Sequence, residues 1–367
     1  MGVDMLSTVK NEVWMNPSSP FVSAVMAVYN GCPHLEEAVQ SILDQTFADF
    51  EFIIINDGST DGSKEVLEQF ATRDDRIRIV HQKNRGLTVS LNRGLHMARG
   101  KYVTRMDADD VSRPKRFGRQ VNFLESNPEV GILGTQIKRI DADGNPHGQW
   151  ILPTDPDVVG WQTLFSTCLC HPTVMMRRSL LDDLNGYAEW ATCAQDYELW
   201  TRAVLESQLA NLPDTLHKLR RHDDSITATK QDEQRRVCRK ATATLHETLL
   251  GEQAEEEFSH FLSWMHRENV QRAAAETGIQ DLTAVHGYIR TLYRVYVRDV
   301  LSGDRNVGVR RAALPKLDAI ADQMAKNYSR AAGFLQKVRA RLMQPTSEIL
   351  PWAVKAASER ASDYKGR

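Results

Sequence analysis

The stretch Val22-Ser23-Ala24-Val25-Met26-Ala27-Val28-Tyr29-Asn30 combines a short apolar run with two polar residues at its end. A run of this length is typical of a buried strand. The next segment places Leu35, Val39 and Ile42 at helical spacing. The same order then repeats, with strands expected at 50–55, 77–80 and 102–106 and helices between them. Strands that alternate with helices in this way predict βαβ units and a parallel sheet.

Polar residues follow three of the expected strands at the point where each strand ends. They are Tyr29-Asn30, Asn56-Asp57 and the carboxylate cluster Asp107-Ala108-Asp109-Asp110. The carboxyl ends of parallel strands meet at one edge of a sheet, and ligands bind beyond that edge. We therefore expect the three groups to gather on one rim, which is the first indication of function.

The carboxylate cluster places three acidic side chains within four residues. Such carboxylates repel one another unless a cation or hydrogen-bond donors neutralise them. One solution is a hard divalent cation held by one or two carboxylates and by phosphate oxygens. The other is an acidic turn that caps the helix expected after Pro114. The position at the rim of a parallel sheet favours the metal site.

Three further residues could carry chemistry, each with a plainer alternative. Asp57 could accept hydrogen bonds from a base or ribose, or it could stabilise a turn. Asp196 stands at the start of an expected helix, on its core-facing side, where the helix N-terminus favours the ionised form that a general base requires; N-capping is the alternative. His222 could complete a metal shell or lie on the surface. Spacing alone leaves these alternatives open.

The pattern changes after Gly131 and again after Lys230. After Gly131 we expect a hairpin-like pair of strands at 132–140 and 149–152. A helix at 156–164, a strand at 173–176 and a polar loop at 217–227 are expected to follow. Beyond Lys230 the pattern is helical only. We expect an N-terminal arm over 1–19, an α/β domain over 20–230 and a helical domain over 231–367.

The last expected helices are basic. Residues 301–367 carry 13 Lys and Arg against 6 Asp and Glu. A solvated helical face explains this composition, and so does a basic surface that docks on anionic lipid or on a partner.

Composition excludes several classes of protein. The chain has 367 residues and a formal charge of −2, which does not fit a dedicated nucleic-acid binder. It has no run approaching 18 apolar residues and no secretion signal in its first twenty, so a cytoplasmic location is expected. The cysteines are five and scattered, which argues against a disulfide framework. Cys168, Cys170 and His171 could suggest a metal site, but no second pair stands at zinc-finger spacing, and buried thiols are favoured.

Several ordered motifs closely resemble family 2 glycosyltransferases with the GT-A fold, an α/β, Rossmann-like, mostly parallel sheet flanked by helices. The resemblance covers about residues 20–230, and the helical C-terminal region matches no family. The motifs are Ser23–Asn30, Ile55–Asp61, Asn84-Arg85-Gly86-Leu87, Gly100-Lys101-Tyr102, Arg105–Asp110, His171–Val174 and Gln195–Trp200.

The resemblance implies a role for each matched position. The nucleotide of a sugar-diphosphate donor would be held by Ala27, Val28, Tyr29, Asn30, Asp57, Arg85, Asp107 and Ala108. Asp109 and His222 would bind Mn²⁺ or Mg²⁺, and Asp196 would be the catalytic base. Further contacts with phosphate or acceptor are expected from Arg105, Asp110, His171, Gln195 and Trp200.

The implied activity is inverting, metal-dependent transfer of a sugar from a nucleoside-diphosphate sugar, with UDP expected, to a hydroxyl of a glycan or lipid-linked acceptor. Cell-envelope or extracellular polysaccharide synthesis is the expected setting. Peripheral contact with the inner face of the cell membrane, through the basic C-terminal helices, and a homodimer are further expectations.

Two alternatives remain. A sugar nucleotidyltransferase or hydrolase could use a similar sheet, although the chain lacks a glycine-rich phosphate loop. A non-catalytic scaffold could bind nucleotide sugars, although the presence of Asp109, Asp196 and His222 argues against lost catalysis.

Overall fold

The computed structural model describes residues 19–221, 230–267, 277, 282–296 and 300. Its centre is a nine-stranded sheet in the order β3-β2-β1-β4-β8-β6-β9-β5, with β7 paired to β6. The strands are β1 Val22–Val28, β2 Phe50–Asn56, β3 Ile77–His81, β4 Tyr102–Met106, β5 Val111–Ser112, β6 Val130–Ile140, β7 Pro146–Trp150, β8 Met175–Arg177 and β9 Gln208–Arg220.

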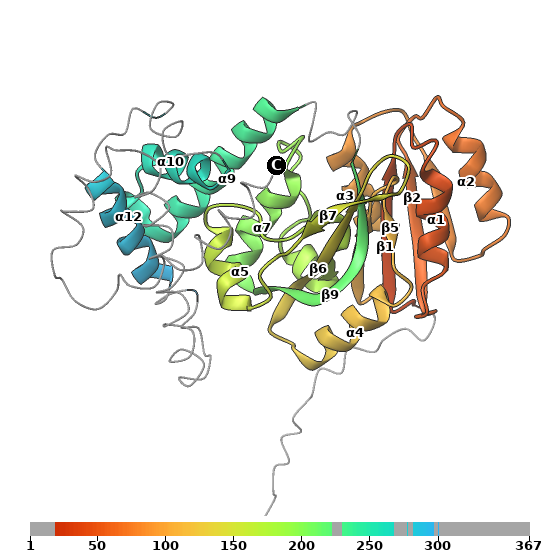
Figure 1. The fold of residues 1–367 in the computed structure, drawn as a ribbon, viewed down its shortest axis with the longest axis horizontal. Coiled ribbons are helices and arrows are strands. Elements are labelled where there is room, and N and C mark those ends of the chain that lie inside the picture. Colours follow the sequence, from red (N-terminus) through yellow and green to blue (C-terminus); the bar gives the residue numbers. More distant parts are fainter. Residues whose placement is uncertain (1–18, 222–229, 268–276, 278–281, 297–299, 301–367) are drawn as a thin grey trace, which may run out of the picture.

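Helices cover both faces of the sheet (Figure 1). They are α1 Leu35–Leu43, α2 Ser63–Ala71, α3 Leu87–Met97, α4 Arg116–Ser126, α5 Pro156–Thr163, α6 Arg178–Asp183, α7 Gln195–Glu206, α9 Gln231–Leu250, α10 Glu256–Arg267 and α12 Leu282–Val295, with the short 3₁₀ helices η1 His171–Thr173 and η2 Gly251–Gln253.

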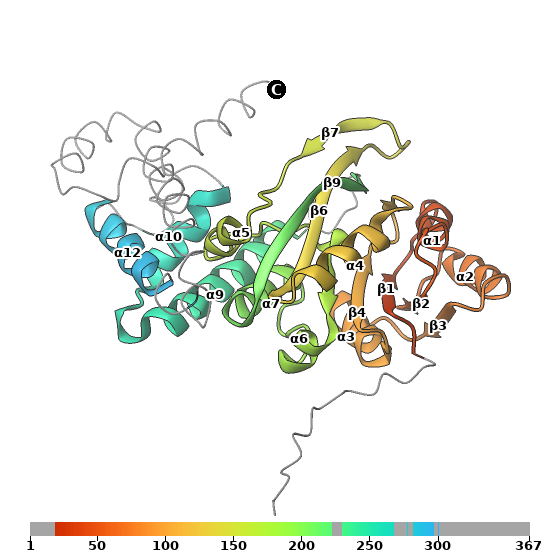
Figure 2. The ribbon, with the colours of Figure 1, turned by 90° about the horizontal axis from the view of Figure 1, so that it is seen from below.

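Side chains that alternate along the strands supply two separate cores. From β1, Ala24 and Met26 face a core closed by α1, α2 and α4. Val25 faces the other core, which α3, α5 and α7 close. This second core continues without a break through α7 into α9, α10 and α12, so the helical end of the molecule packs directly on the α/β part (Figure 2).

The structure confirms the α/β fold and most of the expected elements. The strands β3-β2-β1-β4 are parallel, as predicted. The other half of the sheet is mixed, because β8 runs antiparallel to both β4 and β6 whereas β9 runs parallel to β6. The predicted pair of strands after Gly131 is the β6–β7 pair.

The predicted loop over 217–227 is wrong at its start. His217–Arg220 are the last residues of β9, a strand that the sequence pattern does not predict. β9 pairs with β6 along most of its length and buries His217 and Arg220. Three of its polar residues, Asn211, His217 and Arg220, are buried because they bond to groups on other elements, so β9 lacks the apolar alternation that identifies strands. The strand predicted at 173–176 is shifted, with η1 preceding β8.

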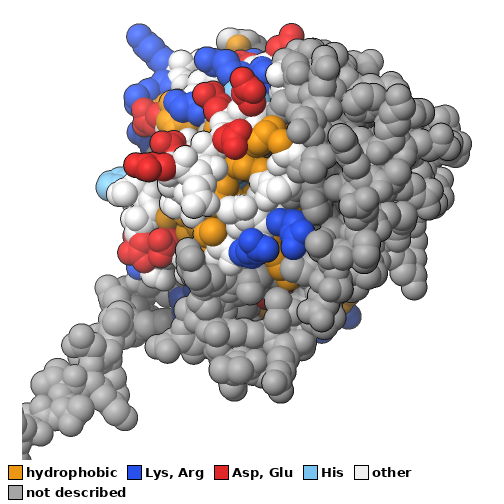
Figure 3. All heavy atoms as spheres, turned by 90° about the vertical axis from the view of Figure 1, so that its left-hand side faces the viewer, with side chains coloured by type: hydrophobic (Ala, Val, Ile, Leu, Met, Phe, Trp, Pro, Cys, Tyr) orange, Lys and Arg blue, Asp and Glu red, His pale blue; other side chains and the backbone are white. Residues whose placement is uncertain are grey.

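The helical end carries charges of both signs next to one another on its described surface (Figure 3). Within the described residues no helix is long and apolar enough to cross a membrane. The N-terminal arm up to residue 18, the expected helix over 312–343 and the basic segment 301–367 lie outside the described residues.

Gly94 allows α3 to pack closely on β1, and it gives the first prediction. A Cβ at this position would lie 2.4 Å from Cγ1 of the buried Val25. We expect Gly94→Ala to lower the free energy of unfolding by about 1–3 kcal/mol through overpacking. Gly118 in α4 is the matched control, because its Cβ would meet no atom nearer than 3.9 Å. Gly118→Ala should leave stability unchanged or raise it, as urea unfolding can measure; equal effects of both variants would contradict the packing account.

His246 joins α9 to its neighbours as a neutral, buried imidazole. Its Nε2 lies 2.9 Å from the carbonyl oxygen of Leu164, so Nε2 carries the proton and Nδ1 accepts from the Ser259 hydroxyl at 2.9 Å. Burial lowers the pKa of His246 to about 4, against a smaller opposing effect of the Leu164 carbonyl.

The lowered pKa of His246 predicts acid sensitivity of the fold. Because the unfolded chain binds this proton near pH 6.5 and the folded chain only near pH 4, stability falls as pH drops through that window. Between pH 7.5 and pH 5 the loss from this residue should be about 2 kcal/mol. Urea unfolding at both pH values should show a smaller difference for His246→Gln than for wild type. The exposed His96 is the control, and an unchanged difference in His246→Gln would contradict the assignment.

Candidate active site

The loops after β1 and β2 are joined at the carboxyl edge of the sheet. Val28 and Asn56 are register partners at the ends of the two strands. Beyond them the backbone N–H of Asn30 donates to Ser59 Oγ at 3.0 Å, and Asn30 Oδ1 accepts from the backbone N–H of Thr60 at 2.8 Å. These reciprocal bonds hold the two loops together at the rim where polar residues are predicted to gather.

Asp57 stabilises the loop that leads into α3. Its Oδ1 accepts from Gln82 Nε2 at 2.7 Å and from the backbone N–H of Arg85 at 2.8 Å. Its Oδ2 accepts from the backbone N–H of Gly86 at 2.8 Å. The residue is only 3% exposed. Asp57 therefore acts in this structure as a turn-stabilising carboxylate, one of the two roles left open by the sequence.

The carboxylate cluster lies at the end of β4, which is parallel to β1. Each of Asp107, Asp109 and Asp110 offers a carboxylate oxygen, and these atoms lie within 4.8 Å of one another. Among the described residues this is the group whose donors fit a metal ion. Asp107 forms a two-pronged ion pair with the buried Arg105.

Electrostatics within the cluster favour a cation. Burial raises the pKa of Asp107, Arg105 opposes that effect, and the charge of Asp109 adds to it. Burial also raises the pKa of Asp110 well above its ordinary value, and repulsion from Asp107 adds to the shift. A divalent ion would relieve this repulsion, and carboxylate oxygens are the ligands that Mg²⁺ and Mn²⁺ prefer. The residues present therefore fit the predicted metal.

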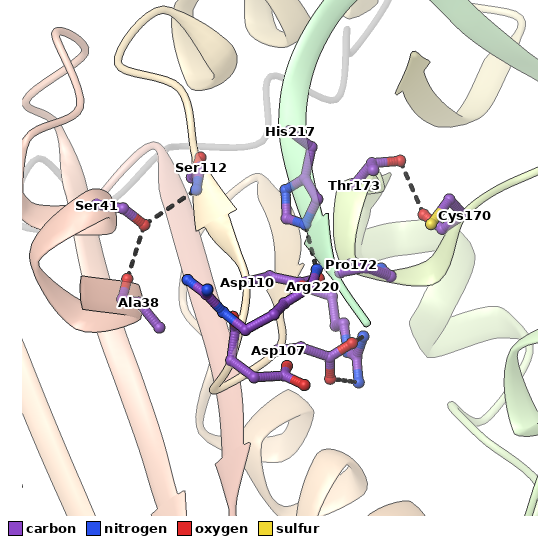
Figure 4. A network of polar contacts seen from close by, with 12 residues as sticks. Ala38, Ser41, Asp107, Asp110, Ser112, Cys170, Pro172, Thr173, His217 and Arg220 are labelled. Atoms are coloured by element: carbon purple, nitrogen blue, oxygen red, sulfur yellow. Dashed lines mark hydrogen bonds and ion pairs between the residues drawn. The ribbon is translucent and has the colours of Figure 1, made fainter. Parts of the chain in front are cut away.

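Asp110 is less suited than its neighbours to bind that ion directly. Its Oδ2 accepts from His217 Nε2 and its Oδ1 from the backbone N–H of Arg220, both at 2.8 Å (Figure 4). It is 1% exposed. Both oxygens are thus engaged by β9 in a buried position, whereas Asp107, although paired with Arg105, and Asp109 are half-buried and therefore more accessible to an ion.

A fully buried arginine stands behind His217. Arg116 Nη1 lies 3.3 Å from His217 Nδ1. A guanidinium can only donate, so Nδ1 accepts and the imidazole proton is on Nε2, directed at Asp110. Burial holds the pKa of His217 well below its ordinary value, reinforced by the Arg116 charge. Burial also lowers the pKa of Arg116 to about 9. This pKa is still above neutral pH, so the guanidinium stays a cation.

His171 and Trp200 form a buried wall beside the cluster. His171 Nε2 lies 2.7 Å from the Tyr187 hydroxyl, and its ring contacts the Trp200 ring edge-to-face. Trp200 is 0% exposed in this structure, and its predicted contact with phosphate or acceptor stays a prediction. His171 is also buried, and burial lowers its pKa well below the ordinary value.

Asp196 lies in the first turn of α7, where the helix N-terminus favours a carboxylate. Ala194 occupies the N-cap position, so Asp196 is not the N-cap residue that the alternative required. Burial raises the pKa of the Cys170 thiol, and the carboxylates of Asp107 and Asp196 both raise it further. The role of Asp196 as catalytic base stays a prediction.

The remaining predicted residues are distributed around this centre. Tyr29 is 56% exposed at the end of β1, and the side chain of Arg85 is also exposed. Ala27 and Ala108 are half-buried, whereas Val28 and Gln195 are buried.

Arg105 is buried and paired with Asp107, which opposes the predicted direct phosphate contact. His222 lies outside the described residues, so its metal role stays a prediction. The favoured buried thiols are confirmed, since Cys168 and Cys170 are buried and form no disulfide.

Sequence reasoning missed Arg116, His217, Arg220 and Tyr187. One signal could have found Arg116. It lies on the same buried helical face as the apolar Phe117 and Val121. A charged residue is unexpected on such a face unless it pairs with a buried polar group. The same signal singles out Asp196. Tyr187 and His217 carry no such signal, because their partners come from distant parts of the chain.

A sheet of this order, flanked by helices and with an acidic cluster at its carboxyl edge, defines a GT-A glycosyltransferase fold. The family model of Glycosyl transferase family 2 matches residues 23–184. EpsE of Bacillus subtilis is 37% identical over 216 residues, which are 57% of this chain and 76% of that protein. Glycosyltransferase GlyG of Streptococcus pneumoniae serotype 4 is 33% identical over 232 residues, 58% of this chain and 75% of its own.

Among solved structures, S. aureus TarS 1–349 in complex with UDP-GlcNAc has a similar fold. The TM-score is 0.56 at 17% identity, and the match covers 87% of this chain and 92% of TarS 1–349. The chain belongs to glycosyltransferase family 2 and is a glycosyltransferase.

Proposed function

We propose that the chain transfers a sugar from a nucleoside-diphosphate sugar to an acceptor hydroxyl, with a divalent metal and with inversion at the anomeric carbon. The single observation that carries the proposal is the close grouping of the carboxylates of Asp107, Asp109 and Asp110 at the carboxyl edge of the sheet. Family membership supports the reaction class, and the fold supports the position of the donor.

The donor side of the site is the joined pair of loops after β1 and β2. The exposed ring of Tyr29 is available to stack on a base, and the exposed Arg85 is available to a phosphate. Asp57 acts by holding the backbone of the 85–86 loop. The TarS structure of similar fold is a complex with UDP-GlcNAc, and UDP-sugars are therefore the first donors to test.

Asp107 and Asp109 would hold Mn²⁺ or Mg²⁺. A divalent ion at that place would offset the charge of the departing nucleoside diphosphate. Arg105 keeps the Asp107 carboxylate oriented through its ion pair.

Asp196 is proposed as the general base that accepts the proton of the attacking acceptor hydroxyl. Its place in the first turn of α7 favours the ionised form that this task needs. One base and one leaving group suffice for a single displacement, which inverts the anomeric centre. An α-linked donor would then give a β-linkage.

The acceptor is proposed to be a hydroxyl of a growing glycan or a lipid-linked sugar in cell-envelope or extracellular polysaccharide synthesis. Docking on the inner face of the cell membrane, a cytoplasmic site of action and a homodimer remain proposals from the sequence. The basic segment on which membrane docking depends lies outside the described residues.

A donor screen tests the proposed reaction. The full chain is incubated with UDP-, GDP- and dTDP-sugars and Mn²⁺, and nucleoside diphosphate release is followed against an EDTA control. Metal-dependent release from one donor is expected, slow without acceptor and faster once a suitable glycan is added. Release of a nucleoside monophosphate or of a sugar phosphate would point to a different reaction class and contradict the proposal.

A further inference from the structure

We propose that Arg116 and His217 are positioning residues that hold the turn carrying Asp107 and Asp109 in the geometry that binds a divalent metal. They form a hydrogen-bonded relay from α4 through β9 to Asp110. The inference rests on the proposed function, because it concerns the metal site of the same reaction.

The relay begins at a guanidinium that is enclosed on every side. Arg116 is 0% exposed and donates from Nη1 to the carbonyl oxygen of Pro172 at 2.6 Å. Its Nη2 lies 3.3 Å from the carbonyl oxygen of Arg105, two residues before the cluster. Arg116 therefore ties the end of β4 to η1, the turn that presents His171.

The relay ends on the cluster itself. His217 accepts from Arg116 and donates to Asp110 Oδ2. The ring therefore holds the Asp110 carboxylate in place relative to the buried guanidinium of Arg116. Arg220 completes the hold from the same strand. Its backbone N–H donates to Asp110 Oδ1 at 2.8 Å (Figure 4). Its Nε donates to the carbonyl oxygen of Asp109, also at 2.8 Å.

Stability alone does not explain these contacts. A buried cation costs free energy unless it is paired, and well-packed apolar side chains of similar volume are often equal or better for stability. Here the cation and the carboxylate do not touch; a neutral imidazole separates them. The arrangement fixes Asp110 on β9, and with it the turn in which Asp107 and Asp109 stand, while Arg105 orients Asp107 through its ion pair. Outer partners of this kind are typically worth about 10–100-fold in metal affinity.

The test compares two substitutions at His217 in the full chain. Gln can accept from Arg116 with Oε1 and donate to Asp110 with Nε2, whereas Leu fills the space and does neither. The readout is Mn²⁺ affinity in the presence of UDP, measured by electron paramagnetic resonance, with thermal unfolding measured on the same samples. We expect His217→Leu to weaken Mn²⁺ binding about 10–100-fold and His217→Gln to restore most of it.

His246 provides a matched control. It is equally buried, and it also donates from Nε2 and accepts at Nδ1, but its partners belong to the helical end and to the segment after α5. His246→Leu should lower the unfolding temperature as His217→Leu does and leave Mn²⁺ affinity unchanged. A loss of Mn²⁺ affinity shared equally by both Leu variants would show a general stability effect and overturn the inference.

A second pair keeps the test valid should His217→Leu fail to fold. His217→Asn carries the same amide as His217→Gln on a chain one methylene shorter, so it cannot span from Arg116 to Asp110. Asn should bind Mn²⁺ more weakly than Gln; equal, wild-type binding by both would overturn the relay. Absence of Mn²⁺ binding in wild type would instead defeat the proposed metal dependence, and the inference with it.

Discussion

Asp196→Asn is expected to lower the rate of sugar transfer by about 10³-fold while the donor still binds. The amide keeps the size of the side chain and removes the basic oxygen that would accept the acceptor proton. General bases contribute about 10²–10⁴-fold, and a thousandfold loss corresponds to about 4 kcal/mol of barrier. Transfer is measured with saturating donor and acceptor, and donor affinity by calorimetry.

Glu206→Gln is the control for Asp196→Asn. Glu206 is the last residue of α7, is exposed, and lies at the opposite end of the helix from Asp196. Both variants replace an acid by its amide on the same helix, so a difference between them reports the effect of the position of the carboxylate. Full activity is expected of Glu206→Gln. Unchanged turnover in Asp196→Asn would show that another group is the base.

Asp109→Asn is expected to weaken Mn²⁺ binding by more than about 100-fold, since outer partners of a metal already contribute up to that amount. Asp109 lies in the tight carboxylate cluster, and its neighbour Asp107 is held by Arg105. An amide replaces one anionic ligand oxygen by a neutral one and also reduces the repulsion on Asp107. Metal affinity should therefore fall even as the apo-protein becomes no less stable.

Asp75→Asn is the control for Asp109→Asn. Asp75 is exposed and precedes β3, so it lies at the amino end of a strand whose carboxyl end faces the site. Thermal unfolding with and without Mn²⁺ provides the second readout, because a bound ion stabilises the folded state by mass action. Stabilisation by Mn²⁺ in wild type and Asp75→Asn, and its loss in Asp109→Asn, is the expected pattern. Equal stabilisation of all three would place the metal elsewhere.

The parallel half of the sheet was predictable because each of its strands is a short apolar run bounded by polar turns. β1 and β2 are buried on both faces, so their composition alone identifies them. β9 was not predictable on that basis. Its last residues, toward the site, include His217 and Arg220, whose burial depends on Asp110 and Arg116 more than 100 residues away.

In the candidate site, too, some features follow from the local sequence and others depend on residues distant in the chain. The acidic cluster and Asp196 follow from local position, at a strand end and at a helix start. The engagement of Asp57 with the 85–86 backbone, and of Asp110 with β9, depends on which loops meet in space. Residue type indicates the chemistry of each carboxylate, but the choice between bracing a loop and binding a ligand depends on its neighbours.

Calorimetric titration of the full chain with nucleoside diphosphates, in Mn²⁺ and in EDTA, decides whether the rim of the sheet is a metal-dependent donor site. We expect one nucleoside diphosphate, UDP first among them, to bind strongly with Mn²⁺ and at least about tenfold more weakly with EDTA. Failure of every nucleoside diphosphate to bind, or equal binding with EDTA, would contradict a metal-dependent donor site at the rim.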